Sequence, residues 1–169
     1  KGFAATGTGS WASGPVMNNG RQTGVSAGTQ TALVTTGGPT EGDSEGVATE
    51  TYNGTAWTDT GHALNVARID AAAVGTQTAA LMSGGGPPTP AGLDSTEIYD
   101  GSSWTEVNNL NTVRVNQASA GSTAAAIVMG GKPARTVVES FDGTSWTEIT
   151  DVNTGRQNAG GAGTQDAAD

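Results

Sequence analysis

The side chains that could do chemistry in this sequence are few, and most of them recur along the chain. Four arginines follow one another at nearly equal intervals: Arg21, Arg68, Arg114 and Arg156. Four tryptophans do the same: Trp11, Trp57, Trp104 and Trp146. Three glutamates share the period: Glu50, Glu97 and Glu139. Catalysis needs particular groups at one place, whereas a set that repeats in step is typical of a structural unit.

Each series nevertheless has an alternative role. Tryptophan could stack on sugar rings, arginine could bind anions, and glutamate could take part in catalysis. A fixed position in the repeat favours packing between sheets for tryptophan. It favours hydrogen bonding to carbonyls or stacking on tryptophan for arginine. For glutamate it favours pairing with arginine or protection of a strand edge. We expect no catalytic residue, no cofactor and no metal.

Residues outside the series offer little more. His62 is the only histidine and the chain has no cysteine, so a metal site or charge relay lacks its partners and we expect His62 in a loop. The acidic segment 41–46 lacks the spacing of a defined Ca²⁺ loop and is interpreted as a solvated turn. The proline-containing segment 84–93 is the longest insertion and a candidate contact surface. Asn53-Gly54-Thr55 matches a glycosylation sequon but occupies a repeated turn.

Charge and composition exclude several classes of protein. Sixteen acidic against seven basic residues give a net charge of −9, which argues against nucleic acid or an anionic membrane as partner. No apolar stretch approaches the length of a membrane span. With 27 glycines and 34% hydrophobic residues, composition alone resembles a disordered chain. The repeated order of the residues nevertheless indicates a folded chain.

The repeat unit predicts the elements that position these side chains. An alternating stretch ends in an aromatic residue (Tyr52, Tyr99 or Phe141), followed by Asn-Gly or Asp-Gly and then by tryptophan, which is a strong hairpin signal. We predict strands at 21–27, 30–36, 48–53 and 56–60, at 68–74, 77–83, 95–100 and 103–107, and at 114–120, 123–130, 136–141 and 145–149. Glycine pairs should end the second strands, where the backbone takes a positive φ or passes close to a neighbour: Gly84, Gly85, Gly130 and Gly131.

Four short antiparallel strands per period describe one blade of a β-propeller. The arginine, the glycine pair, the aromatic with its Asp/Asn-Gly and the tryptophan stand in the order of the kelch motif, and the chain resembles kelch-type propellers over nearly its whole length. The resemblance implies an all-β fold of four-stranded blades, three complete and a fourth split between the ends of the chain. Trp57, Trp104 and Trp146 should then be buried between blades.

The likeness to kelch propellers also bears on function. Related copper oxidases need two histidines and a cysteine crosslink, which this chain lacks, and the sialidase box is out of register here. The Ala/Gly/Thr-rich phrases GTQTA and SWTE resemble repeats of bacteriophage structural and tail proteins, especially marine ones. We therefore expect a non-enzymatic structural or attachment module of a virion that contacts other virion or cell-surface proteins or a glycan. The alternative is a secreted bacterial carbohydrate-binding or adhesive propeller attached to a larger enzyme, so the expected location is virion or extracellular.

The organisation predicted from the repeats is a single propeller domain, or a segment of one, over residues 1–169. Repeats are expected at about 12–58, 59–105 and 106–147, with a partial blade from 1–11 plus 148–169. Because the last expected strand stops short of its siblings, we expect a segment of a longer repeat chain or several copies that complete one another.

Overall fold

The computed structural model describes residues 13–40, 46–86, 92–133 and 135–168, and in these residues the chain is all β-strand and loop. Trp11, the acidic residues at 41–45 and the prolines at 87, 88 and 90 lie outside the described residues. The first sheet consists of β1 (Val25–Thr29), β2 (Ala32–Thr36), β3 (Ala48–Tyr52) and β4 (Trp57–Ala63). The second consists of β5 (Ala72–Thr76), β6 (Ala79–Ser83), β7 (Thr96–Tyr99) and β8 (Trp104–Val107). The third consists of β9 (Ala118–Gly121), β10 (Ala126–Met129), β11 (Val138–Phe141) and β12 (Trp146–Ile149), and a short hairpin follows, β13 (Gly163–Thr164) with β14 (Ala167–Ala168).

Each sheet is antiparallel, and its four strands pair in chain order. The Asn-Gly and Asp-Gly dipeptides form the turns that join the third strand to the fourth, so that the aromatic residue lies opposite the tryptophan. Tyr99 pairs with Trp104 in the second sheet and Phe141 with Trp146 in the third. The hairpin signal thus fixes the register as well as the turn.

The predicted strands agree with the structure within three residues at the second, third and fourth positions of each sheet. The first strands begin four residues later than predicted, because each arginine precedes its strand instead of starting it. Between arginine and strand the chain passes through a residue with positive φ, which interrupts extended backbone: Thr23, Asp70 or Asn116. The repeat boundaries at 58, 105 and 147 also need correction, since each cuts a fourth strand that runs on past it.

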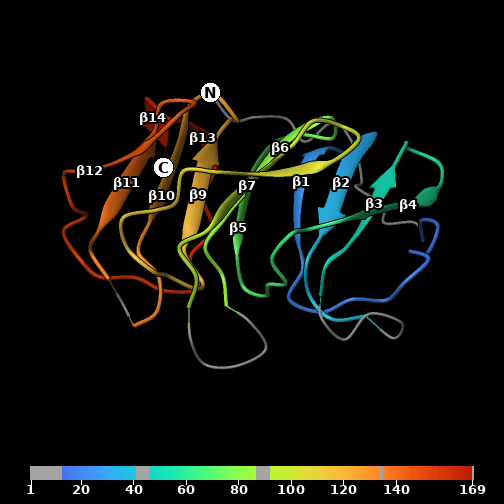
Figure 1. Cartoon of the computed structure of the whole chain (residues 1–169), viewed down its shortest axis with the longest axis horizontal. Helices are drawn as coiled ribbons and strands as arrows, with labels where there is room; N and C mark the ends of the chain where they lie inside the picture. Colours follow the sequence, from blue (N-terminus) through green and yellow to red (C-terminus); the bar gives the residue numbers. More distant parts are fainter. Residues whose placement is uncertain (1–12, 41–45, 87–91, 134, 169) are drawn as a thin grey trace, which may run out of the picture.

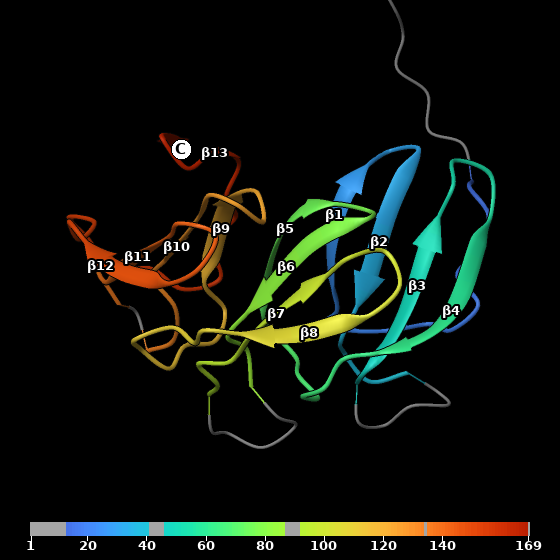
Figure 2. The ribbon, with the colours of Figure 1, turned by 45° about the horizontal axis from the view of Figure 1, so that its top comes forward.

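The three sheets stand side by side like blades, with their first strands innermost (Figure 1). β1 contacts β5, β5 contacts β9, and β9 contacts β13 of the last hairpin (Figure 2). Backbone hydrogen bonds connect one blade to the next: Asp70 donates to the Thr23 carbonyl, Asn116 to that of Asp70, and Asn158 to that of Asn116. The arrangement is propeller-like.

The core lies between the blades. One apolar cluster joins the first and second sheets through Val34, Leu64, Met82 and Trp104, and a second joins the second and third sheets around Leu81 and Trp146. Small residues on the facing strands let the sheets approach closely. In the described part of the chain no helix has the length and apolar character to cross a membrane.

The glycine pairs behave as predicted from their place at the ends of second strands. Gly84 and Gly85 both have positive φ. A Cβ at Gly85 would lie 2.6 Å from the Ile69 carbonyl oxygen, and one at Gly130 would lie 2.6 Å from the Arg156 carbonyl oxygen. The pair in each sheet therefore lets the backbone approach the chain segment that carries an arginine.

Candidate functional site: the carboxylate clamps and the open aromatic face

A buried glutamate in each sheet is held by a set of donors that we call the carboxylate clamp: an asparagine, the backbone N–H of the next residue, and the arginine three residues after the asparagine. In the second sheet the Arg68 Nη2 lies 2.7 Å from the Glu97 Oε1. The Asn65 backbone N and Nδ2 donate to Oε2 at 2.8 and 2.9 Å, and the Val66 N donates to Oε1 at 3.1 Å. Four donors on one carboxylate satisfy a charge that would otherwise be costly to bury.

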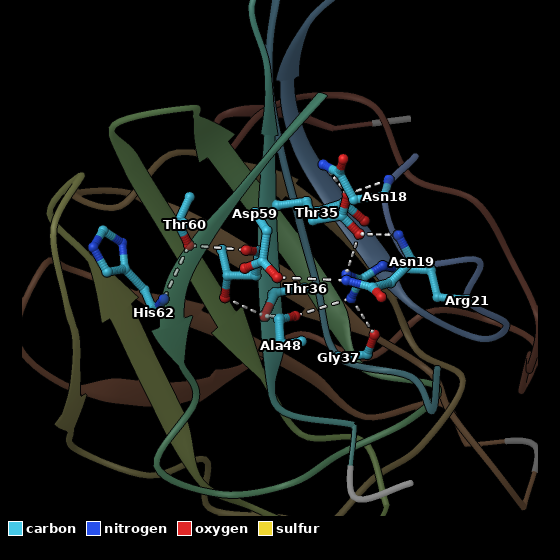
Figure 3. A network of polar contacts seen from close by, with 12 residues as sticks. Asn18, Asn19, Arg21, Thr35, Thr36, Gly37, Ala48, Asp59, Thr60 and His62 are labelled. Atoms are coloured by element: carbon cyan, nitrogen blue, oxygen red, sulfur yellow. Dashed lines mark hydrogen bonds and ion pairs between the residues drawn. The ribbon is translucent and has the colours of Figure 1, made fainter. Parts of the chain in front are cut away.

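The same clamp recurs in the other two sheets. Arg114 pairs with Glu139 at 2.6 Å, with Asn111 as the second ligand. Arg21 pairs with Glu50 at 3.0 Å. The backbone N–H groups of Asn18 and Asn19 also donate to the Glu50 carboxylate. Figure 3 shows Asn18, Asn19 and Arg21 together on one side of the polar network.

The remaining guanidinium donors hold the backbone together. The Arg68 Nη1 donates to the carbonyls of Gly84 and Ser95, which follow β6 and precede β7. Burial lowers the pKa of Arg68, and the neighbouring Glu97 opposes that shift. Burial acts on the pKa of Arg114 in the same direction, and Glu139 opposes it. The expected pairing of glutamate with arginine is present, but these glutamates are buried on interior strands and do not protect strand edges.

Two of the three described tryptophans are buried between sheets, as expected. Trp104 and Trp146 are each 6% exposed, and each indole N–H donates to a threonine of the preceding sheet, Thr49 at 3.0 Å and Thr96 at 3.1 Å. Trp57 is only half-buried, so the expectation of burial is wrong for this residue. The reason is directional: each tryptophan faces the preceding sheet, and no described sheet stands in front of Trp57.

The glutamine at the turn between the first and second strands of a sheet also contacts the preceding sheet. The Gln77 amide donates to the carbonyls of Leu33 and Tyr52 in the preceding sheet. Gln165, in the last hairpin, makes the equivalent pair of bonds to the third sheet. Gln30 stands at the same repeat position in the first sheet and is exposed. Gln30, Tyr52 and Trp57 together make up what we call the open aromatic face.

His62 lies on β4, not in a loop as expected. Its Nδ1 is 2.7 Å from the Tyr99 hydroxyl, which donates to the Gly101 carbonyl at 3.0 Å. Because the Tyr99 hydroxyl donates its proton to Gly101, a hydrogen on the His62 Nδ1 completes the chain of bonds by donating to the Tyr99 oxygen. Burial raises the pKa of Tyr99, and the charge of Asp100 adds to the effect. His62 thus ties the first sheet to the second.

The exposed aspartates that follow the aromatic residues accept hydrogen bonds within the hairpin turns. Asp100 accepts from the Ser102 hydroxyl and from the backbone N–H groups of Ser102 and Ser103, which lowers its pKa to about 2. The backbone N–H groups of Ser145 and Thr144 lower the pKa of Asp142 in the same way. Asn53, the sequon asparagine, accepts equivalent bonds from Thr55 and Ala56. These side chains form turns.

The described residues contain no group of three histidine, aspartate or glutamate side chains placed to hold a metal ion. A shallow hollow beside the first clamp is lined by Gly20, Arg21, Gln22, Pro39 and Thr40. The Arg21 guanidinium in it is already paired with Glu50.

Sequence reasoning missed the asparagine of the clamp. The signal was available, because the pattern Asn-x-x-Arg occurs four times in step with the repeat: at Asn18, Asn65, Asn111 and Asn153. It also missed the bridging glutamines, although Gln30, Gln77 and Gln165 share one repeat position.

Comparison with known proteins identifies the fold alone. No family model matches the chain, and no curated protein matches it. Among solved structures, the chain is similar to that titled "Structure of YjhT", with a TM-score of 0.66 at 13% sequence identity. The match covers 84% of this chain and 56% of that one, so the chain spans little more than half the length of its structural neighbour.

Proposed function

We propose that this chain is a non-enzymatic contact module built from kelch-type propeller blades. The observation that carries the proposal is that the repeated charged groups pair with one another. The three clamps pair their arginines with buried glutamates, and of these groups only the Nε of Arg21 has no hydrogen-bond partner among the described residues, so they have little capacity left for a substrate. The kelch assignment is supported by the order of arginine, glycine pair, aromatic residue and tryptophan in each described sheet.

The contact made by this module is with other proteins of a virion or with a host cell surface. The Ala/Gly/Thr-rich repeats, which resemble those of bacteriophage structural and tail proteins, support this location. The net charge of −9 favours a protein or glycan partner over nucleic acid.

Mass spectrometry of virus particles purified from the source culture tests this proposal. The protein should co-purify with particles through a density gradient, at a constant ratio to the major capsid protein. The particle-free supernatant serves as the control. Recovery from that supernatant alone, as part of a longer polypeptide, would contradict the virion role and favour the second candidate.

The second candidate is a secreted carbohydrate-binding propeller. The open aromatic face favours it, because Tyr52 and Trp57 are half-exposed with ring centroids 5.0 Å apart, and exposed aromatic faces stack on sugars. A glycan array probed with the wild-type chain and with Trp57→Ala tests it. Binding that Trp57→Ala abolishes would support this role, and the absence of any binding would remove it.

A further inference from the structure

The turn between β3 and β4 carries an asparagine where the other two sheets carry aspartate. Asn53 is followed by Gly54, and the corresponding dipeptides at 100–101 and 142–143 are both Asp-Gly. The Asn53 side chain is exposed, while its backbone N–H donates to the Ala56 carbonyl and fixes the turn. Asparagine is among the thermally labile residues of proteins. A following glycine leaves the side-chain carbonyl carbon open to attack by the next backbone nitrogen, because no Cβ obstructs the approach.

Three donors converge on the Asn53 Oδ1. The backbone N–H groups of Thr55 and Ala56 each donate to it at 2.9 Å, and the Thr55 hydroxyl donates at 2.8 Å. These bonds polarise the side-chain carbonyl and stabilise the negative charge that develops on Oδ1 when a nucleophile adds to Cγ, as donors do in an oxyanion hole. Among the described residues no acceptor holds the Asn53 Nδ2, and none holds the Gly54 N–H. Both the leaving group and the nucleophile are therefore available.

The aspartates at the same repeat position accept similar bonds but are protected by their charge. Asp100 accepts from the backbone N–H groups of Ser102 and Ser103 and from the Ser102 hydroxyl. These donors lower its pKa to about 2 and so keep it ionised, and a carboxylate resists attack by a nucleophile. The same set of donors activates the neutral amide of Asn53, which makes this residue the reactive member of the series.

A second Asn-Gly pair, Asn19-Gly20, lacks this arrangement of donors. The Asn19 side chain is half-buried, and its Nδ2 lies 3.5 Å from the Asp59 Oδ2. No donor among the described residues reaches its Oδ1. The two pairs thus share a dipeptide and differ in their surroundings, so Asn19 is an internal control for the effect of the turn.

We propose that Asn53 is a site of spontaneous modification, at which the folded turn promotes loss of the side-chain amide as ammonia. The Gly54 nitrogen forms a bond to the Asn53 Cγ, the Cγ–Nδ2 bond breaks, and the NH₂ group leaves as ammonia with the proton that Gly54 gives up. Water then opens the resulting cyclic imide. Addition of water at Cγ breaks the new N–Cγ bond and gives aspartate, whereas addition at the backbone carbonyl carbon breaks the original peptide bond and gives isoaspartate.

The two products have different consequences for the hairpin. Aspartate at position 53 makes the turn equal to those at 100–101 and 142–143 and adds one negative charge to the chain. Isoaspartate inserts a methylene group into the backbone between β3 and β4, which displaces Tyr52 from its register partner Trp57. This modification is independent of the contact function proposed above.

Incubation of the folded chain in mildly alkaline buffer, followed by peptide mapping with mass spectrometry, measures the reaction at both pairs. We expect Asn53 to lose ammonia at least about tenfold faster than Asn19, as for one hydrogen bond to a developing charge. The two rates should become similar in guanidinium chloride, where the turn is lost. Thr55→Ala, which removes the hydroxyl donor, should slow the reaction at Asn53 about twofold to tenfold. Thr58→Ala, which changes an exposed threonine on β4, should leave the rate unaltered.

The proposal is wrong if Asn53 keeps its amide in the folded chain or reacts no faster than Asn19. An unchanged rate in Thr55→Ala, or the same difference between the two pairs in guanidinium chloride, would also overturn it, because the turn would then have no part in the reaction. Asn53→Asp supplies the aspartate product as a standard for isoelectric focusing. Should Thr55→Ala fail to fold, the comparison of Asn53 with Asn19 in the wild-type chain still decides the matter.

Discussion

Trp104 and Trp57 occupy the same position in neighbouring blades, and replacing each by alanine should have very different effects. Trp104 is buried, stacks on Tyr99 with ring centroids 5.0 Å apart, and donates to the Thr49 hydroxyl. A buried tryptophan removes on the order of 150–250 Å² from water, about 4–6 kcal/mol at about 25 cal/mol per Å². Since truncation of a core tryptophan costs about 3–5 kcal/mol in practice, we expect Trp104→Ala to lower the free energy of unfolding by that amount.

Trp57→Ala should cost only about 1–2 kcal/mol, because the side chain is half-buried and its indole has no hydrogen-bond partner among the described residues. Urea unfolding followed by far-UV circular dichroism measures both variants, and equal m-values would show that the same cooperative unit unfolds. A cost for Trp57→Ala equal to that for Trp104→Ala would refute the reasoning, since it would mean that the open aromatic face is covered.

Three further predictions concern polar groups. Glu97→Gln should destabilise the chain by about 3–5 kcal/mol in urea unfolding, because it breaks a buried ion pair, whereas Glu106→Gln on the exposed face of β8 should change stability by less than about 0.5 kcal/mol. Asp100 has a folded pKa of about 2 against 3.8 ordinarily, so its contribution to stability should be present above about pH 4 and be lost as the pH falls through 2; NMR titration of its carboxyl checks this, and Asp100→Asn should remove that part of the pH dependence. Gln77→Ala should cost about 1–2 kcal/mol and the exposed Gln30→Ala nearly nothing, which thermal melts of the two variants would distinguish.

The fold could be predicted from the sequence because its strongest signals are local. An aromatic residue, Asn-Gly or Asp-Gly and a tryptophan define a hairpin within nine residues, and the period repeats that hairpin three times. Composition pointed the other way, toward disorder, because it does not register that small residues face one another between sheets. Order along the chain carried information that amino-acid content did not.

The errors arose where a position depends on another blade. Arg68 was predicted to begin a strand, yet its side chain pairs with Glu97 of β7, and Asp70, which has a positive φ, separates it from β5. The half-exposure of Trp57 could not be predicted from the period alone, because burial depends on the sheet that each tryptophan faces, and no described sheet faces Trp57. His62 has no counterpart in the repeat, so periodicity gave it no place on β4.

A repeated side chain that is buried with all its partners has no bonding capacity left, and the clamps of the second and third sheets are of this kind. In the first sheet the Nε of Arg21 is buried without a hydrogen-bond partner among the described residues. For the proposed contact module, recognition therefore falls to side chains that lack a partner among the described residues. Trp57 is one of these, since it is half-buried whereas Trp104 and Trp146 are buried between sheets. The same repeat position thus either packs against the preceding sheet, as at Trp104 and Trp146, or presents aromatic surface, as at Trp57.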